Sequence, residues 1–319
     1  MAVYTPVSDA ALERFLSDYA VGRPRVFKGI AEGVENSNFF LETEHGRFVL
    51  TLYEKRVQAT DLPFFLGLMA HAAGKGFPCA PPIAMKSGAV LGELNGRPAA
   101  LVAFMDGVSP QTPSVTQCAA GGRALARFHR ASADFTLQRE NDLSLLGWRE
   151  LFDRHRAKTD AFGGGVGAEV ATVLTGLERT WPKGAPQGVI HADLFPDNVL
   201  FLGDRVSSFI DFYFACDDAL AYDLAVCLNA WGFDADHRFD PERAQAFTRG
   251  YQEIRALSAL ERDALPVFCQ GAALRFFLTR LADWGESGPG ALVREKDPAE
   301  YLIKVRFHRD AADPAVYGL

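Results

Sequence analysis

The chain has 319 residues, 48% of them hydrophobic, and a formal net charge of -7. This length allows one large domain or two modest ones and can fold without disulfides or a structural metal. The acidic balance, with no stripe of Lys or Arg, argues against nucleic acid and anionic membranes as partners. No apolar run approaches the ~20 residues that span a bilayer, and no signal peptide is apparent.

The five cysteines are widely spaced and form no Cys-x-x-Cys pair: Cys79, Cys118, Cys216, Cys227 and Cys269. We expect them to be reduced and to pack as small apolar residues, which fits a cytoplasmic protein. The seven histidines do not cluster at ligand spacing, which argues against a zinc site.

The first ~100 residues predict a β-rich unit. Residues 8–20 have the apolar stripe of a capped helix, and residues 38–43 and 47–53 read as a hairpin with Gly46 in the turn. A helix over 61–75 and an apolar strand over 99–104 follow.

Residues 105–107 look like a connector, after which the sequence is mostly helical. A short strand and a hairpin interrupt the helices before residue 219. The elements expected are helices 118–131, 144–158 and 167–181, a loop at 163–165, strands 188–190, 199–202 and 206–210, and helices beyond about 219. The chain is therefore expected to divide into two units, 1–105 and 106–319.

The stretch from Ile190 to Asp211 carries the chemistry. Asp193 follows a strand, Asn198 lies five residues later at the root of the hairpin, and Asp211 ends the hairpin's second strand. Because a hairpin returns its ends to one place, Asn198 and Asp211 should converge. Two such oxygen ligands suit Mg²⁺, and Asp193 beside them is placed to accept a proton from a hydroxyl.

Phosphoryl transfer needs these groups. A metal neutralises the charge on the phosphates while a carboxylate positions the nucleophile. The offset from Asp193 to Asn198 equals that of the kinase pattern His-x-Asp-x-x-x-x-Asn, and Ile210-Asp211-Phe212 matches the metal-binding Asp. His191, the first residue of the pattern, is expected to brace the loop rather than to transfer protons.

These residues resemble the superfamily of aminoglycoside phosphotransferases and choline kinases, relatives of the protein kinases. Leu125–His129 is similar to that superfamily's helix ending in Leu-His, and Asp218–Ala225 to its Asp-x-x-x-Tyr-Asp-Leu-Ala segment. The resemblance implies that His129 supports the catalytic loop and that Asp223 is structural. It also implies an α+β, bilobal protein-kinase-like fold, with an N-terminal antiparallel sheet lobe and a larger helical lobe.

Within the superfamily the chain resembles the bacterial homoserine kinases of threonine biosynthesis over nearly its full length. The resemblance implies an ATP- and Mg²⁺-dependent kinase that phosphorylates the side-chain hydroxyl of L-homoserine. The stretches that carry it are 33–40, 48–54, 191–198, 210–216 and 273–281.

The fold implied by the resemblance places a Gly-containing turn over the ATP phosphates, here residues 29–38. Backbone N–H groups of such a turn can hold anionic oxygens, with Gly33 as a candidate and Asn36 and Ser37 as side-chain donors. Gly29 and Gly33 can equally be ordinary hairpin glycines.

The strand at 48–51 aligns with the kinase strand that carries a phosphate-pairing lysine. Alternation puts Val49 and Thr51 on one face, where Val49 would touch adenine. Thr51 stands where the lysine is expected. The phosphates must therefore be bound either by another cation, with Lys55 and Arg56 nearest in sequence, or by Mg²⁺ and backbone groups.

By analogy with the same fold, the adenine edge should bond to the connector backbone around Phe104 and Met105.

A homoserine site needs a cation for the carboxylate, and Arg275 and Arg280 are the candidates, unless they are ion-paired elsewhere. Aromatic residues at 212–214, Tyr213 among them, can wall a pocket. They can also face a quaternary ammonium, which keeps choline-like substrates open.

Three functions remain open on the sequence alone: a homoserine kinase, a kinase of another small alcohol such as choline, ethanolamine, a sugar or an aminoglycoside, and a non-catalytic kinase-like binding module. The sequence does not indicate the oligomeric state.

Overall fold

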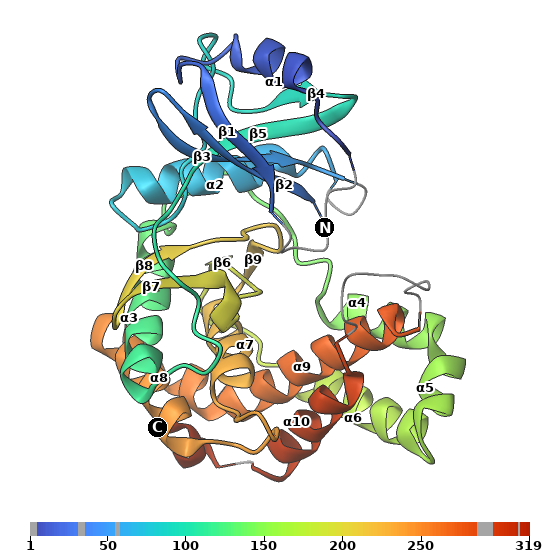
Figure 1. Cartoon of the computed structure of the whole chain (residues 1–319). Helices are drawn as coiled ribbons and strands as arrows, with labels where there is room; N and C mark the ends of the chain where they lie inside the picture. The colour runs from blue at the N-terminus through green and yellow to red at the C-terminus, as the bar shows by residue number, and fades with distance from the viewer. Residues whose placement is uncertain (1–4, 31–35, 55–57, 286–295, 312) are drawn as a thin grey trace.

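The computed structural model describes residues 5–30, 36–54, 58–285, 296–311 and 313–319. Its N-terminal lobe is a five-stranded antiparallel sheet in the order β1-β2-β3-β5-β4 (Figure 1). The elements of this lobe are α1 (Asp9–Leu16), β1 (Pro24–Gly29), β2 (Ser37–Thr43), β3 (Gly46–Leu52), α2 (Leu62–Gly74), β4 (Gly92–Leu94) and β5 (Arg97–Ala103).

The alternation along β3 sorts its side chains between two helices. Phe48, Leu50 and Leu52 belong to the core that buries Leu12 and Phe15 of α1. The intervening residues of β3 face the other side, which α2 covers. The predicted division of this strand into two faces is confirmed.

Two strands of the N-terminal lobe, β1 and β4, were not predicted from the sequence. β1 lies at the edge of the sheet, begins with a proline and leaves most of its side chains partly or fully exposed, so it shows no apolar alternation. β4 has only three residues and pairs with β5. Predicted helix 8–20 is also wrong at its end, because α1 stops at Leu16.

The C-terminal lobe is mainly helical, as predicted, and two small antiparallel sheets lie on its upper side (Figure 1). Its elements are α3 (Val115–Ala131), α4 (Leu145–Arg154), α5 (Arg156–Phe162), α6 (Val166–Thr180), β6 (Gln187–Ile190), η1 (Pro196–Asn198), β7 (Val199–Leu202), β8 (Arg205–Phe209), β9 (Cys216–Ala219), α7 (Leu220–Trp231), α8 (Pro241–Ile254), α9 (Ala259–Asp283), α10 (Pro298–Asp310) and η2 (Pro314–Tyr317).

The long helix α9 crosses the C-terminal lobe and packs against α7 and α10. It starts with a capping box between Ser258 and Glu261, a local signal that fixes its first residue. Predicted helix 144–158 is wrong as one element, because the chain breaks at His155 into α4 and α5. β9, which pairs with β6, was not predicted because Asp217 and Asp218 in its centre are not typical of a strand.

The connector between the two lobes is held by contacts on both sides. Arg47 on β3 binds both carboxylate oxygens of Asp106 at 3.0 Å, and Val108 exchanges two backbone hydrogen bonds with Phe201 on β7. The boundary at residues 105 and 106 remains a prediction.

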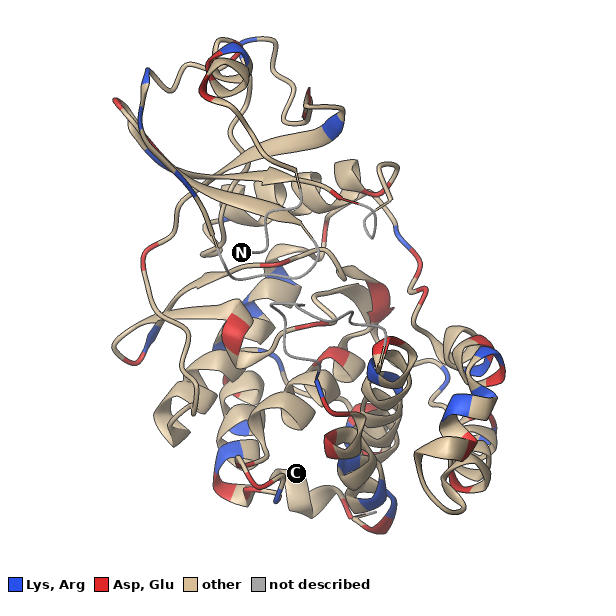
Figure 2. Ribbon diagram, turned by 45° about the vertical axis from the view of Figure 1, so that its right-hand side comes forward, with Lys and Arg blue, Asp and Glu red and all other residues tan. Residues whose placement is uncertain are grey.

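All five cysteines are free of disulfide bonds and buried, which confirms their predicted role as small core residues. Searched over the described ranges, the helices include none long and apolar enough to cross a membrane. Figure 2 shows basic and acidic residues interspersed over the helices of the C-terminal lobe.

Candidate active site

The loop after β6 carries Asp193, and its geometry is fixed by a neighbour five residues away. Asn198, at the end of η1, donates through Nδ2 to the backbone oxygen of Asp193 at 2.7 Å and to its carboxylate at 3.3 Å. Because Nδ2 is used in this way, the amide oxygen of Asn198 points away from Asp193. That oxygen is available to a cation.

The β7–β8 hairpin brings Asp211 to the same place, as predicted. Ile210 donates its backbone N–H to the carbonyl of Asn198 at 3.1 Å, and Asp211 follows with a left-handed φ of 62°. Ala192, which precedes Asp193, has a φ of 61°. Left-handed conformations of residues other than glycine are uncommon and tend to mark functional sites. Here two such residues, Ala192 and Asp211, are neighbours of Asp193.

Asp223 in α7 holds the loop from below. Its carboxylate accepts hydrogen bonds from the backbone N–H groups of His191 at 2.8 Å and Ala192 at 2.9 Å, and from Nε2 of His129 at 3.0 Å. Asp223 and His129 are buried, and Asp223 does not line the cavity described below. This geometry matches the bracing role that the resemblance implies for both residues.

His191 is buried, and its Nε2 donates to the carbonyl of Ile210, the residue before Asp211. Burial lowers the pKa of its imidazole, so the neutral form is favoured. His191 therefore ties the loop to the end of β8, which fits a positioning residue better than a proton carrier.

Burial and the neighbouring charges shift the pKa of the Asp193 carboxyl in different directions. Burial raises the pKa of its carboxyl to about 8; the Arg275 guanidinium lowers it, and the neighbouring Asp211 carboxylate raises it. Near neutral pH the raised pKa favours the protonated carboxyl, while the ionised form, which general base catalysis needs, is a stronger base than an ordinary aspartate.

Two of the predicted substrate residues, Tyr213 and Arg275, line a cavity of about 400 Å³, whereas Asp193, Asn198 and Asp211 are not among its lining residues. Arg275 comes from α9, is 2% exposed and donates through Nη1 to the carbonyl of Ala192. The rings of Phe214 and Phe276 flank its guanidinium. Its Nε has no hydrogen-bond partner within the described ranges of the chain.

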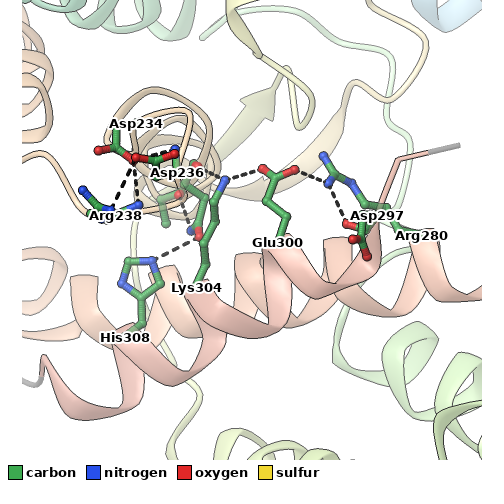
Figure 3. Close-up of polar contacts among 10 residues, drawn as sticks. Asp234, Asp236, Arg238, Arg280, Asp297, Glu300, Lys304 and His308 are labelled. Carbon is green, nitrogen blue, oxygen red and sulfur yellow. Dashed lines mark hydrogen bonds and ion pairs between the residues drawn. The ribbon is translucent and has the colours of Figure 1, made fainter. Parts of the chain in front are cut away.

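Arg280 is placed differently. Its Nη1 is bonded to Glu300 at 2.5 Å and to the carbonyl of Asp297 at 3.3 Å, and Glu300 in turn binds Lys304 (Figure 3). Arg280 does not line the cavity. It is the ion-paired arginine that the sequence analysis left open, and we do not retain it as a substrate residue.

Only some of the candidate ATP residues of the N-terminal lobe can be placed. Gly33, with Lys55 and Arg56, lies outside the described residues. The hydroxyl of Ser37 donates to Glu54 at 2.7 Å, and the side-chain oxygen of Asn36 accepts from the N–H of Glu54 at 3.3 Å. Ser37 thus uses its only hydroxyl hydrogen within the protein, so it has no side-chain donor left for phosphate.

On β3, Val49 is partly buried on the face opposite α1, and the hydroxyl of Thr51 donates to Asn38 at 2.8 Å. Tyr53 follows Thr51 on the same face and contacts the C-terminal lobe, because its hydroxyl lies 3.2 Å from the hydroxyl of Tyr213.

The connector residues Phe104 and Met105 follow β5 directly. Phe104 donates its N–H to the carbonyl of Arg47, so that donor is taken, and Met105 packs against the main core.

Two cations near the site were not singled out from the sequence. Arg139 lines the cavity and bonds to Asp61 at the start of α2 at 2.7 Å. The ammonium of Lys296 lies 5.3 Å from the ring of Phe195, which belongs to the loop after β6. Both are single residues in loops, 54 and 103 positions away from Asp193 in opposite directions. No local pattern could have found them.

The chain is similar to known phosphotransferases over its whole length. A model of the phosphotransferase enzyme family matches residues 26–257. A homoserine kinase of Methylobacterium radiotolerans is 56% identical over 318 residues, covering 100% of this chain and 99% of the relative. A homoserine kinase of Rhodospirillum rubrum is 55% identical over 319 residues, with the same coverage of both chains.

Solved structures agree on the fold. The amicoumacin kinase hAmiN, in complex with AMP-PNP, Ca²⁺ and Ami, aligns with a TM-score of 0.69 at 14% identity, covering 95% of this chain and 92% of its own. A spectinomycin phosphotransferase in complex with ADP and spectinomycin aligns with a TM-score of 0.68 at 16% identity, covering 98% of both chains. The predicted kinase-like α+β fold is confirmed, and the chain belongs to the phosphotransferase enzyme family.

Proposed function

We propose that this protein transfers the γ-phosphoryl group of ATP to the side-chain hydroxyl of L-homoserine, forming O-phospho-L-homoserine and ADP. The observation that supports this substrate is the 53–56% identity, over the full chain, to relatives named homoserine kinase. The chemistry is supported by Asp193, Asn198 and Asp211, which meet in one loop and one hairpin.

In the proposed reaction the bond from the γ-phosphorus to the β–γ bridging oxygen breaks and a bond to the homoserine oxygen forms. Asp193 orients that hydroxyl and accepts its proton. Ala192 and Asp193 hold their positions because Asp223 and Asn198 bond to the loop on both sides.

The oxygens of Asn198 and Asp211 fit Mg²⁺, which takes one or two protein ligands and completes its shell with water and phosphate oxygens. When bound there, the ion would neutralise charge on the phosphates. Asn198 would contribute its amide oxygen, because Nδ2 is bonded to Asp193.

We assign Arg275 to the homoserine carboxylate. Arg275 lines the cavity, its buried Nε has no partner among the described residues, and its Nη1 bonds to the carbonyl of Ala192, the residue before Asp193. Asp61, Asp142 and Asp283 line the same cavity, where Asp61 and Asp142 are already paired with Arg139.

A steady-state assay tests this assignment. Arg275→Lys should raise the KM for L-homoserine at least about tenfold, because a bidentate contact is lost, while the KM for ATP changes little. Arg280→Lys is the matched control, since Arg280 lies on the same helix and pairs with Glu300. Equal effects of the two substitutions on the KM for homoserine would refute the assignment of Arg275.

A further inference from the structure

The strand position that carries a phosphate-pairing lysine in kinases holds Thr51 here, and its hydroxyl is bonded to Asn38. Strand β3 therefore offers no cation at that position. The transferred phosphoryl group carries charge on three oxygens, and a fixed cation beside it lowers the barrier. Among the described residues two cations contact the loop that carries Asp193: Arg275 bonds to the carbonyl of Ala192, and the ammonium of Lys296 lies 5.3 Å from the ring of Phe195.

These two cations differ in what else they contact. Arg275 is 2% exposed, bonds to the backbone of Ala192 and lines the substrate cavity. Lys296 is exposed, has no hydrogen bond or ion pair to any described residue, and does not line that cavity. Its ammonium lies over the ring of Phe195, two residues beyond Asp193. Three donors on a flexible stem suit a phosphoryl group, which presents several oxygens at once.

The backbone that carries Lys296 is fixed by the polar network of Figure 3. Asp297, the next residue, caps α10 by accepting from Ala299 at 2.8 Å, and its carbonyl accepts from Arg280. Glu300 on the first turn joins Arg280 to Lys304. This network holds the start of α10, and therefore Lys296, against α9.

The ring beneath the ammonium is fixed as well. Phe195 packs edge-on against Phe276 of α9, with centroids 5.0 Å apart, and Phe276 packs against Tyr301 of α10 at 5.1 Å. One aromatic residue of α9, Phe276, thus joins the loop that carries Asp193 to the start of α10 through two ring contacts. A cation held over an aromatic face keeps its ammonium partly oriented while leaving donors for a ligand.

We propose that Lys296 is a catalytic residue, which contacts the phosphoryl group during its transfer from ATP to the substrate hydroxyl at Asp193. It supplies positive charge to the transferred group from the start of α10, whereas the β3 lysine of kinases pairs the α/β-phosphates. Lys296 itself forms and breaks no covalent bond and gives up no proton. The inference rests on the proposed kinase function, but it does not depend on which alcohol is the acceptor.

Lys296→Met tests the proposal. Loss of a donor that acts only in the transition state should lower kcat by about 10²-fold and leave the KM values for ATP and L-homoserine within about threefold of wild type. Lys296→Arg should restore at least some of the rate. Lys183→Met, at an exposed lysine in the turn before β6, is the control and should behave as wild type.

A substrate without a carboxylate distinguishes whether Lys296 contacts the phosphoryl group or binds the carboxylate of homoserine. With the diol analogue of homoserine, in which CH₂OH replaces the carboxylate, Lys296→Met should lose the same factor in kcat. If the substitution instead raises the KM for homoserine, leaves kcat unchanged and has no effect on the diol, Lys296 reads the substrate carboxylate and the proposal is wrong. A kcat within about threefold of wild type also overturns it.

A binding measurement keeps this test separate from the proposed substrate. The complex of Mg-ADP with tetrafluoroaluminate imitates the phosphoryl group in transfer, and its affinity can be measured by calorimetry. Lys296→Met should weaken that complex at least about tenfold relative to Mg-ADP alone. Absence of homoserine turnover in the wild type would reject the proposed substrate, whereas equal affinities in wild type and variant would reject the role of Lys296.

Discussion

At the scale of single residues, Asp193 is the group on which the proposed chemistry depends. Asp193→Asn removes the proton acceptor but keeps a side chain of the same shape. We expect turnover to fall at least about 10³-fold, with the affinity for Mg-ATP within a few-fold of wild type. Asp197→Asn, at an exposed aspartate of the same loop, is the control. Wild-type turnover in Asp193→Asn would contradict the assignment.

The same substitution should stabilise the protein. The pKa of Asp193 is raised to about 8 by burial, against about 3.9 in an unfolded chain, so the folded state favours the protonated form. The stability contributed by protonated Asp193 is present below the unfolded pKa and is lost as the pH rises toward 8. Asparagine stays neutral and avoids this loss.

Thermal unfolding without metal or nucleotide checks this prediction. The melting temperature of Asp193→Asn should exceed that of wild type by roughly 2–4 °C at pH 8, and the difference should shrink at pH 5.5. A variant less stable than wild type at pH 8 would show that the ionised carboxylate is well accommodated in the folded protein.

The sequence identified the local portion of the site. Asp193, Asn198 and Asp211 fall within 19 residues and are joined by one loop and one hairpin, so their offsets carry the geometry. Arg275 was a candidate, but the sequence could not separate it from Arg280, because both lie on α9 and only the packing of α10 pairs one of them. Lys296 was missed because its position beside Phe195 also depends on how α10 packs, which the sequence does not show.

At the scale of elements, helices α3 and α8 cross closely at two glycines. A Cβ on Gly122 would lie well inside van der Waals contact of the carbonyl oxygen of Phe247, and one on Gly250 would overlap Ala119. The two helix backbones can approach this closely only because neither glycine has a side chain. This packing supports α3, which carries His129, the partner of Asp223.

Gly122→Ala should therefore destabilise the protein by about 1–3 kcal/mol, since the helices must separate. Gly176→Ala is the matched control: Gly176 lies within α6, and a Cβ there would meet nothing within 4 Å. That control should stabilise the protein by about 0.5–1 kcal/mol through helix propensity. Denaturant unfolding of both variants is the measurement, and equal shifts would refute the close crossing.

Elements with strong local patterns were predicted well, and those that depend on partners were not. The hairpins β2–β3 and β7–β8 have alternation and a turn glycine. Edge strand β1 and the acidic strand β9 are strands only because β2 and β6 pair with them. The break at His155 between α4 and α5 has no proline or glycine to announce it.

At the scale of the whole molecule, Arg139 connects the N-terminal lobe to the C-terminal lobe beside the cavity. Its guanidinium bonds to Asp61 at the start of α2, and its backbone N–H bonds to Asp217 on β9 at 2.8 Å. The guanidinium also lies over the ring of Phe65 of α2, 5.3 Å from its centroid. The position of α2 over the cavity therefore depends on this residue.

Arg139→Met should raise the KM for L-homoserine more than it lowers kcat, because the cavity wall is loosened while Asp193 keeps its contacts. Arg149→Met, which breaks a pair with Glu178 between α4 and α6, is the control and should leave the KM unchanged. Steady-state kinetics decide the matter, and an unchanged KM in Arg139→Met would show that the two lobes are held beside the cavity without its guanidinium.

The central claim is that the whole molecule is an ATP-dependent kinase of L-homoserine. The most direct test incubates the protein with ATP, Mg²⁺ and one acceptor at a time, drawn from L-homoserine, choline, ethanolamine, a sugar and an aminoglycoside, and follows the products by phosphorus NMR. We predict a phosphate monoester of L-homoserine and stoichiometric ADP, with Asp193→Asn inactive in parallel. Efficient phosphorylation of another acceptor, with none of L-homoserine, would contradict the claim.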